Sequence, residues 1–148
     1  MAEILDTCEK KQQPVILTLG VKSPRYPEFY FPEWVKHKSP DNNDTQKKIL
    51  NFIKQAVNNF KHLSCVEYYQ VENEALDPSG PDHQIIPLSF LKQEVEFVKK
   101  LDTKPVIITL WGNELSKRNF LNQLSSISDV VGIDLYYQQS RENKENIG

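Results

Sequence analysis

Three observations predict an α/β fold of about four parallel β/α units. Continuous apolar runs of strand length occur at residues 14–20 and 105–111, which is typical of strands buried on both faces. Segments whose apolar residues recur at helical spacing alternate with such runs along the chain. A strand followed by a helix and another strand is the unit of a parallel sheet, so we expect one sheet covered by helices.

The other elements follow from the periodicity between these runs. The clearest helical stripe lies between residues 45 and 61, and Asp44 or Thr45 is expected as its N-cap. Residues 21–44 form a long connection rich in Pro and aromatic residues, and loops of this length usually carry function. The full prediction is a helix at 2–12, a strand at 14–20, a helix to about 61, a strand at about 64–74, a helix around 88–98, a strand at 105–111, a weaker helix at about 115–126 and a strand at 130–137.

The composition is that of one globular unit. The chain has 148 residues, with 18 Lys and Arg against 20 Asp and Glu, so its charge favours neither nucleic acid nor an anionic membrane as a partner. No apolar run approaches the roughly 20 residues needed to cross a bilayer, and the first residues lack the pattern of a signal peptide. We therefore expect a cytoplasmic protein, unless the true N-terminus is missing. Residues 1–137 are expected to form the domain, and residues 138–148 a frayed polar tail.

The fold is centred on the stretch Tyr-Tyr-Gln-Val-Glu-Asn-Glu at residues 68–74. This run of strand-forming residues closes on Glu72, Asn73 and Glu74, and a turn-forming stretch follows at residues 77–81. Active sites of α/β barrels lie at the carboxyl ends of strands. The stretch therefore predicts a strand whose end carries chemistry.

The pentapeptide Gln-Val-Glu-Asn-Glu at residues 70–74 resembles the fourth strand of the barrel glycoside hydrolases of clan A, which include many β-galactosidases, cellulases and mannanases. In that family an Asn-Glu pair ends the strand. The Glu is the general acid/base, and the Asn contacts the sugar hydroxyl next to the bond that is broken. The resemblance implies these roles for Glu74 and Asn73, and it implies a partial TIM (β/α)8 barrel that covers strands three to six. Ala75 stands where many members have Pro or an aromatic residue.

The chemistry of glycoside cleavage explains these residue types. One carboxylic acid must stay protonated near neutral pH to protonate the leaving group, and a second carboxylate must stabilise or attack the oxocarbenium-like centre. If the strand stays extended, Gln70, Glu72 and Glu74 share one face, because side chains alternate along a strand. Glu72 would then be a polar neighbour that raises the pKa of Glu74.

Aromatic residues supply the expected wall of a sugar site. Flat aromatic rings cover the apolar face of a pyranose while polar groups hold its hydroxyls. Trp34 is the best candidate in the long connection, and Trp111 ends the third strand beside Gly-Asn-Glu. The sixth strand of the family often ends in an aromatic residue near the sugar, and Tyr136 or Tyr137 fits that place.

The size of the chain limits this assignment. A complete barrel takes about 200 residues or more, and the family's nucleophile lies at the end of the seventh strand, which no residue here matches. The favoured interpretation is a glycoside hydrolase fragment that carries Glu74, binds carbohydrate and is inactive alone. The first alternative is a non-catalytic half barrel that binds carbohydrate or self-associates through its open sheet edges. The second is an enzyme that draws both carboxylates from this segment, Glu74 with Glu114 or Asp134.

Other chemistries have little support in the sequence. The three histidines, His37, His62 and His83, are scattered without the spacing of a zinc site, and no Ser or Cys elbow suggests a catalytic triad. The five glycines form no phosphate-binding cluster. No cofactor or metal is therefore expected.

Overall fold

The structure is a computed structural model of the chain, and it describes residues 2–22, 38–78, 85–112 and 118–135. Its four strands form one parallel sheet in the order β1-β2-β3-β4, and helices alternate with the strands along the chain. This is the α/β arrangement of consecutive units in a (β/α) barrel, so the predicted fold class is confirmed. The elements are α1 (Ala2–Lys10), β1 (Val15–Leu19), α2 (Asn43–Phe60), β2 (Val66–Val71), α3 (Leu88–Leu101), β3 (Val106–Trp111), α4 (Arg118–Ser125) and β4 (Val130–Asp134).

Every element expected from the sequence is present, and the differences lie at the ends. The N-cap of α2 is Asn42, whose side chain accepts hydrogen bonds from the backbone N–H groups of Asp44 and Thr45. The prediction of Asp44 or Thr45 as the cap was therefore wrong by two or three residues. Thr45 instead lies buried within the helix. The predicted domain boundary at residue 137 and the polar tail at 138–148 lie outside the described residues.

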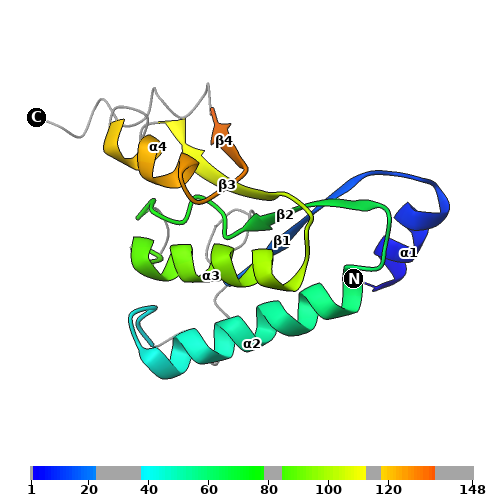
Figure 1. The fold of residues 1–148 in the computed structure, drawn as a ribbon, viewed down its shortest axis with the longest axis horizontal. Helices are drawn as coiled ribbons and strands as arrows, with labels where there is room; N and C mark the ends of the chain where they lie inside the picture. Colours follow the sequence, from blue (N-terminus) through cyan, green and yellow to red (C-terminus); the bar gives the residue numbers. More distant parts are fainter. Residues whose placement is uncertain (1, 23–37, 79–84, 113–117, 136–148) are drawn as a thin grey trace, which may run out of the picture.

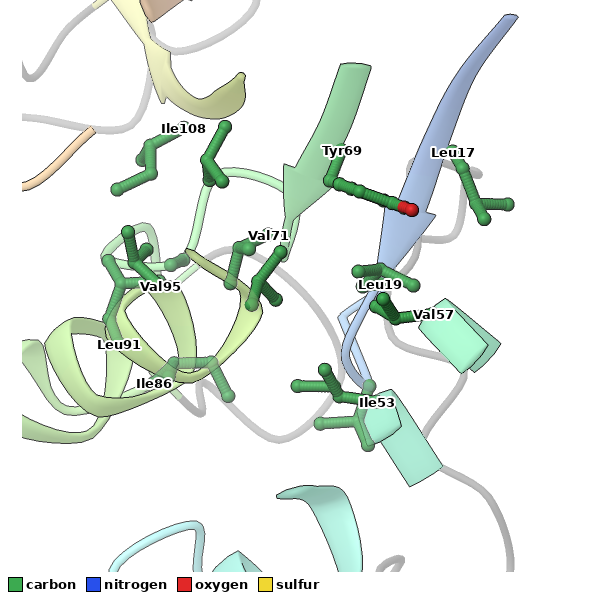
Figure 2. Close-up of a cluster of buried hydrophobic side chains, with 14 of the residues drawn as sticks. Leu17, Leu19, Ile53, Val57, Tyr69, Val71, Ile86, Leu91, Val95 and Ile108 are labelled. Carbon is green, nitrogen blue, oxygen red and sulfur yellow. The ribbon is translucent and has the colours of Figure 1, made fainter. Parts of the chain in front are cut away.

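The hydrophobic core fills the space between one face of the sheet and the helices. Figure 1 shows α2 and α3 on the same side of the sheet, and α4 packs against β4. Figure 2 shows buried side chains between the strands and these helices, and Tyr69 lies among them as the largest fully buried side chain of the described residues. Alternation along the strands brings one residue in two to this face. The labelled core residues are Leu17, Leu19, Ile53, Val57, Tyr69, Val71, Ile86, Leu91, Val95 and Ile108.

The opposite face of the sheet is less covered by the described residues. Ile16 of β1 is 52 % exposed, although Leu17 and Leu19 on either side of Thr18 are buried. Val130 of β4, the register partner of Ile107, is 40 % exposed on this face. The expectation that β1 is buried on both faces was wrong for this part of the chain, because the described helices cover one face alone.

The central strand ends three residues earlier than predicted. β2 stops at Val71, and both Glu72 (φ 57°) and Glu74 (φ 44°) adopt the left-handed conformation. The chain therefore turns sharply, and Gln70, Glu72 and Glu74 do not share a strand face as expected. The cause is non-local: backbone N–H groups that follow β1 hold the Glu72 carboxylate.

The two cysteines are free thiols: Cys65 is buried beside the start of β2, and Cys8 on α1 is half-buried. Within the described ranges, every helix is too short or too polar to span a bilayer. The cytoplasmic location stays a prediction.

Candidate active site

The polar residues of the site gather where the parallel strands end. The turn Glu72–Asn73–Glu74 follows β2, and residues 20–22 follow β1. β3 contributes Thr109 and Trp111, while β4 contributes Asp134, which pairs in register with Trp111. These residues share one edge because the carboxyl ends of parallel strands lie together. That edge is the place at which (β/α) barrels carry their active sites.

Glu72 anchors the turn to the segment after β1. Its carboxylate accepts hydrogen bonds from the N–H of Val21 at 3.0 and 2.9 Å and from the N–H of Lys22 at 2.5 Å. Gly20 (φ +106°) makes this approach possible, since a Cβ at this position would lie 2.3 Å from the Glu72 carboxyl carbon. The conformation is one that L side chains rarely adopt. Glycine is thus required twice at this position, for its backbone conformation and for the space it leaves.

The carboxyl of Glu72 is fully buried and lies next to a second buried acid. Burial raises the pKa of Glu72 to about 7, against the lowering effect of the backbone N–H groups, of Glu94 and of the Lys22 charge. Glu94 of α3 is also 0 % exposed, and burial and the charge of Glu72 raise its pKa well above the ordinary range. Glu72 is therefore enclosed within the protein, and its expected part in the sugar site stays a prediction.

Lys22 is the buried cation of the site. Its Nζ donates hydrogen bonds to the backbone carbonyl oxygens of Glu74 at 2.5 Å and Asp77 at 2.6 Å, and the residue is 2 % exposed. A buried ammonium needs charge compensation and hydrogen-bond acceptors, and this environment supplies both. Lys22 thereby fixes the two ends of the turn that contains Glu74.

Asn73 and Glu74 are held from the other side by β3. The Thr109 hydroxyl accepts a hydrogen bond from the N–H of Glu74 at 3.0 Å and donates one to Asn73 Oδ1 at 3.5 Å. Gln70 Nε2 donates to the same Asn73 oxygen at 3.1 Å. Asn73 is 6 % exposed, so its orientation is fixed by packing and by this network.

The Glu74 side chain meets a second carboxyl, that of Asp134. The Glu74 residue is 3 % exposed, and its side chain lies within hydrogen-bonding reach of the Asp134 carboxyl at the end of β4. Burial raises the pKa of Asp134, and the hydrogen bond from Glu74 acts in the opposite direction. Two carboxyl groups can share a hydrogen bond only if one of them carries a proton. The contact therefore favours a proton held between the two carboxyls at this edge of the sheet.

The structure brings some of the predicted residues together and leaves others outside its range. Glu72, Asn73, Glu74, Trp111 and Asp134 all lie at the same edge, and Trp111 is half-buried at the end of β3. Trp34, Tyr136, Tyr137 and Glu114 lie outside the described residues.

Three contributors were not predicted from the sequence. Lys22 stands at the start of the long connection, where a lysine is normally solvated. Gly20, two residues earlier, is a signal that another group approaches the backbone closely there. Glu94 stands three residues after Leu91 and four before Val98, within the apolar stripe of its helix, and an acid at such a position is a detectable signal. Thr109 is a single hydroxyl within the apolar run of β3, and nothing in the sequence indicated that it contacts the Asn-Glu pair.

A metal centre has no support in the described part of the chain. Those residues contain no group of three or more His, Cys, Asp or Glu side chains placed to hold a metal ion. The candidate chemistry at this edge is that of carboxyl groups, one amide and a buried ammonium.

Comparison with known proteins supports the fold. No family model matches the chain, and no curated protein matches it. Among solved structures, the chain is similar to a β-D-glucuronidase from Dictyoglomus thermophilum, with a TM-score of 0.63 and 17 % sequence identity. The match covers 96 % of this chain and 23 % of the glucuronidase chain. At this identity the likeness supports the fold alone, and the chain spans less than a quarter of the length of the protein it matches.

Proposed function

We propose that this chain carries the acid/base part of a retaining glycoside hydrolase site, with Glu74 as the general acid/base and a carbohydrate as the substrate. The observation that carries the proposal is the buried Glu74 carboxyl, which lies within hydrogen-bonding reach of Asp134 at the carboxyl edge of a parallel sheet. A general acid must hold a proton near neutral pH, and burial next to another acid favours the protonated form.

In this mechanism Glu74 protonates the oxygen of the leaving group and later removes a proton from the attacking water. Asn73 lies beside it, and its Oδ1 accepts hydrogen bonds from Gln70 and Thr109. These bonds fix the orientation of the Asn73 amide, which would contact a sugar hydroxyl. Trp111 offers an aromatic face at the adjacent strand end. The roles of Trp34 and Tyr136 as further sugar contacts remain part of the proposal.

The contact between Glu74 and Asp134 bears on the source of the second carboxylate. The two carboxyl groups of a retaining pair stand about 5 to 5.5 Å apart, and those of an inverting pair about 6.5 to 9.5 Å. Carboxyls within hydrogen-bonding reach of one another, as proposed for Glu74 and Asp134, stand closer than either value. This favours Asp134 as a partner that tunes Glu74, and it favours a nucleophile supplied by a different strand.

The test measures hydrolysis by the protein that carries this sequence, at its full natural length, with glycosides whose leaving groups differ in acidity. Glu74→Gln should lower turnover of alkyl glycosides by roughly 10²- to 10⁴-fold, the usual contribution of general acid/base catalysis. Dinitrophenyl glycosides need no proton on the leaving group, so their cleavage step should change far less. Asp77→Asn is the matched control, because the Asp77 residue contacts Lys22 through its backbone carbonyl. Unchanged turnover of alkyl glycosides by Glu74→Gln would contradict the proposal.

A second candidate function is a non-catalytic half barrel that assembles through its sheet edges. The exposed apolar side chains of Ile16 on β1 and of Val130 and Ile133 on β4 favour it, since both edge strands present such residues within the described part of the chain. Open edges with apolar side chains promote association between sheets. Concentration-dependent dimerisation would support this candidate.

A further inference from the structure

A second pair of acids lies behind the turn that carries Glu74. Glu72 and Glu94 are each 0 % exposed and lie against one another, one after β2 and one on α3. The hydrolytic chemistry described above uses neither of them. Two buried acids in contact are costly if both are charged, so the arrangement needs a physical explanation.

The hydrogen bonds to the two acids are distributed unequally. The Glu72 carboxylate accepts from the N–H groups of Val21 and Lys22. Neither oxygen of Glu94 accepts a hydrogen bond from any described residue, and the polar group next to them is the Glu72 carboxyl. A charged Glu94 would thus be a buried anion that receives no donor. A neutral Glu94 instead has a hydroxyl to donate, and Glu72 is the acceptor beside it.

The charges around the pair lead to the same assignment. Lys22 is the cation whose charge acts on Glu72, and the other acids of the same turn are Glu74 and Asp77. The buried residues of α2, which packs against α3, are Thr45, Ile49, Ile53 and Val57, and none of them is charged. One buried cation facing two acids is balanced when one acid stays neutral.

We propose that Glu94 is a positioning residue for Glu74. As a neutral carboxylic acid it donates a hydrogen bond to the Glu72 carboxylate, which fixes Glu72 against the backbone of Val21 and Lys22 and so fixes the turn. Lys22 completes the connection, because its Nζ donates to the Glu74 carbonyl oxygen. The inference that Glu94 supports catalysis rests on the proposed function of Glu74. The inference that Glu94 fixes the turn is independent of that function.

The test compares two variants of Glu94, one that keeps a hydrogen-bond donor at this position and one that removes it. Glu94→Gln keeps a donor of the same shape in its amide N–H, while Glu94→Leu keeps similar volume and removes the donor. Because the pKa of Glu94 is raised in the folded state, its contribution to stability is complete below the unfolded pKa and is lost as pH rises through the folded pKa. Glu94→Gln removes this loss, because the amide does not titrate.

Thermal unfolding between pH 5 and pH 9 and amide hydrogen exchange are the measurements. The Tm of the unmodified chain should fall as pH rises toward 9, and Glu94→Gln should weaken that fall. Glu94→Leu should lower the Tm by about 4 to 10 °C, the usual effect of losing a hydrogen bond to a charged group in a chain of this size. Exchange at the Glu74 amide should accelerate in Glu94→Leu and stay unchanged in Glu94→Gln.

Two outcomes would overturn the inference: a carboxyl ¹³C shift showing Glu94 ionised at pH 7, or a Glu94→Gln chain as destabilised as Glu94→Leu. The Glu94→Gln arm keeps the test decisive if Glu94→Leu fails to fold. Because these readouts do not involve hydrolysis, their failure leaves the role of Glu74 untouched. Hydrolysis that is insensitive to Glu74→Gln would remove the proposed function and leave the effect of Glu94 on the turn in place.

Discussion

The backbone N–H of Glu74 donates a hydrogen bond of 3.0 Å to the hydroxyl of Thr109, which ties the acid that follows β2 to the neighbouring strand β3. The same hydroxyl donates to Asn73 Oδ1, so it serves as acceptor and donor for the two residues of the Asn-Glu pair. The contact is buried and joins positions 35 residues apart. The orientation of the pair therefore depends on a neighbouring strand as well as on its own.

Thr109→Val should destabilise the turn while preserving the shape of the side chain. The substitution leaves the buried N–H of Glu74 without its acceptor, and an unsatisfied buried donor costs about 1 to 3 kcal/mol. Denaturant unfolding measures the loss. Thr109→Ser is the control, since it keeps the hydroxyl and removes a methyl group. If Val is tolerated better than Ser at this position, packing of the methyl outweighs the hydrogen bond, and the prediction is wrong.

Gly20→Ala should be among the more damaging single substitutions in the chain. The φ of +106° is unfavourable for any residue with a Cβ, and the new Cβ would lie 2.3 Å from the Glu72 carboxyl carbon. Strain of this kind costs of the order of 1 to 3 kcal/mol, to which displacement of the carboxylate adds. Denaturant unfolding is the measurement. Gly132→Ala is the comparison, because its nearest contact is the Thr109 methyl at 3.2 Å. Equal losses for both variants would contradict the requirement for glycine at residue 20.

The order of the elements was predictable because it depends on local periodicity. The stripe of Ile49, Ile53 and Val57 lies at helical spacing, and all three residues are fully buried in α2. The run around Val106–Trp111 has the apolar character of a buried strand, and β3 occupies it. Local patterns of this kind determine which segments become helices or strands.

The conformation of the site was not predictable, because contacts distant in sequence determine it. An extended strand through Glu74 agrees with local propensity, but Glu72 is held by Val21, which is 51 residues away. That contact turns the chain at Glu72 and directs Glu74 toward Asp134. The burial of Lys22 has the same origin, since its acceptors are 52 and 55 residues away. Residue types indicated a site at the strand ends, and tertiary contacts decided how its members face one another.

The titration of Asp134 should reveal which carboxyl of the pair holds the proton. Burial raises the pKa of Asp134, and the hydrogen bond that Glu74 donates lowers it. Glu74→Met removes that donor and keeps water out, so the pKa of Asp134 should rise further. Glu74→Gln keeps a donor and should leave the pKa of Asp134 nearly unchanged. Carboxyl ¹³C titration by NMR is the measurement. A lower pKa of Asp134 in Glu74→Met would mean that Glu74 is the ionised member of the pair.

The raised pKa of Asp134 also affects the free energy of unfolding. Because the folded pKa of Asp134 is raised, its contribution to stability is present below the unfolded pKa and is lost as pH rises through the folded pKa. Asp134→Asn should therefore remove part of the stability loss on raising the pH. Denaturant unfolding at several pH values measures the effect. Asp129→Asn should show the opposite dependence, since a hydrogen bond from Lys99 lowers the pKa of Asp129.

The edge strands allow the assembly candidate to be tested directly. Ile16 on β1 and Ile133 on β4 are half-exposed, and a charge at either position opposes association through that edge. If the chain dimerises through its edges, Ile133→Lys should raise the dissociation constant by roughly 10- to 100-fold, because burial of one such side chain contributes about 1.5 to 3 kcal/mol. Sedimentation equilibrium over a range of concentrations measures it.

Ile4→Lys is the matched control for this experiment. Ile4 is 68 % exposed, but it lies on α1 rather than on an edge strand. The control should leave any dimerisation unchanged, whereas association through a general apolar surface should be weakened by Ile4→Lys as strongly as by Ile133→Lys. If the chain stays monomeric at all concentrations, its exposed edges do not drive association between copies. That result would contradict self-assembly, the main part of the second candidate function.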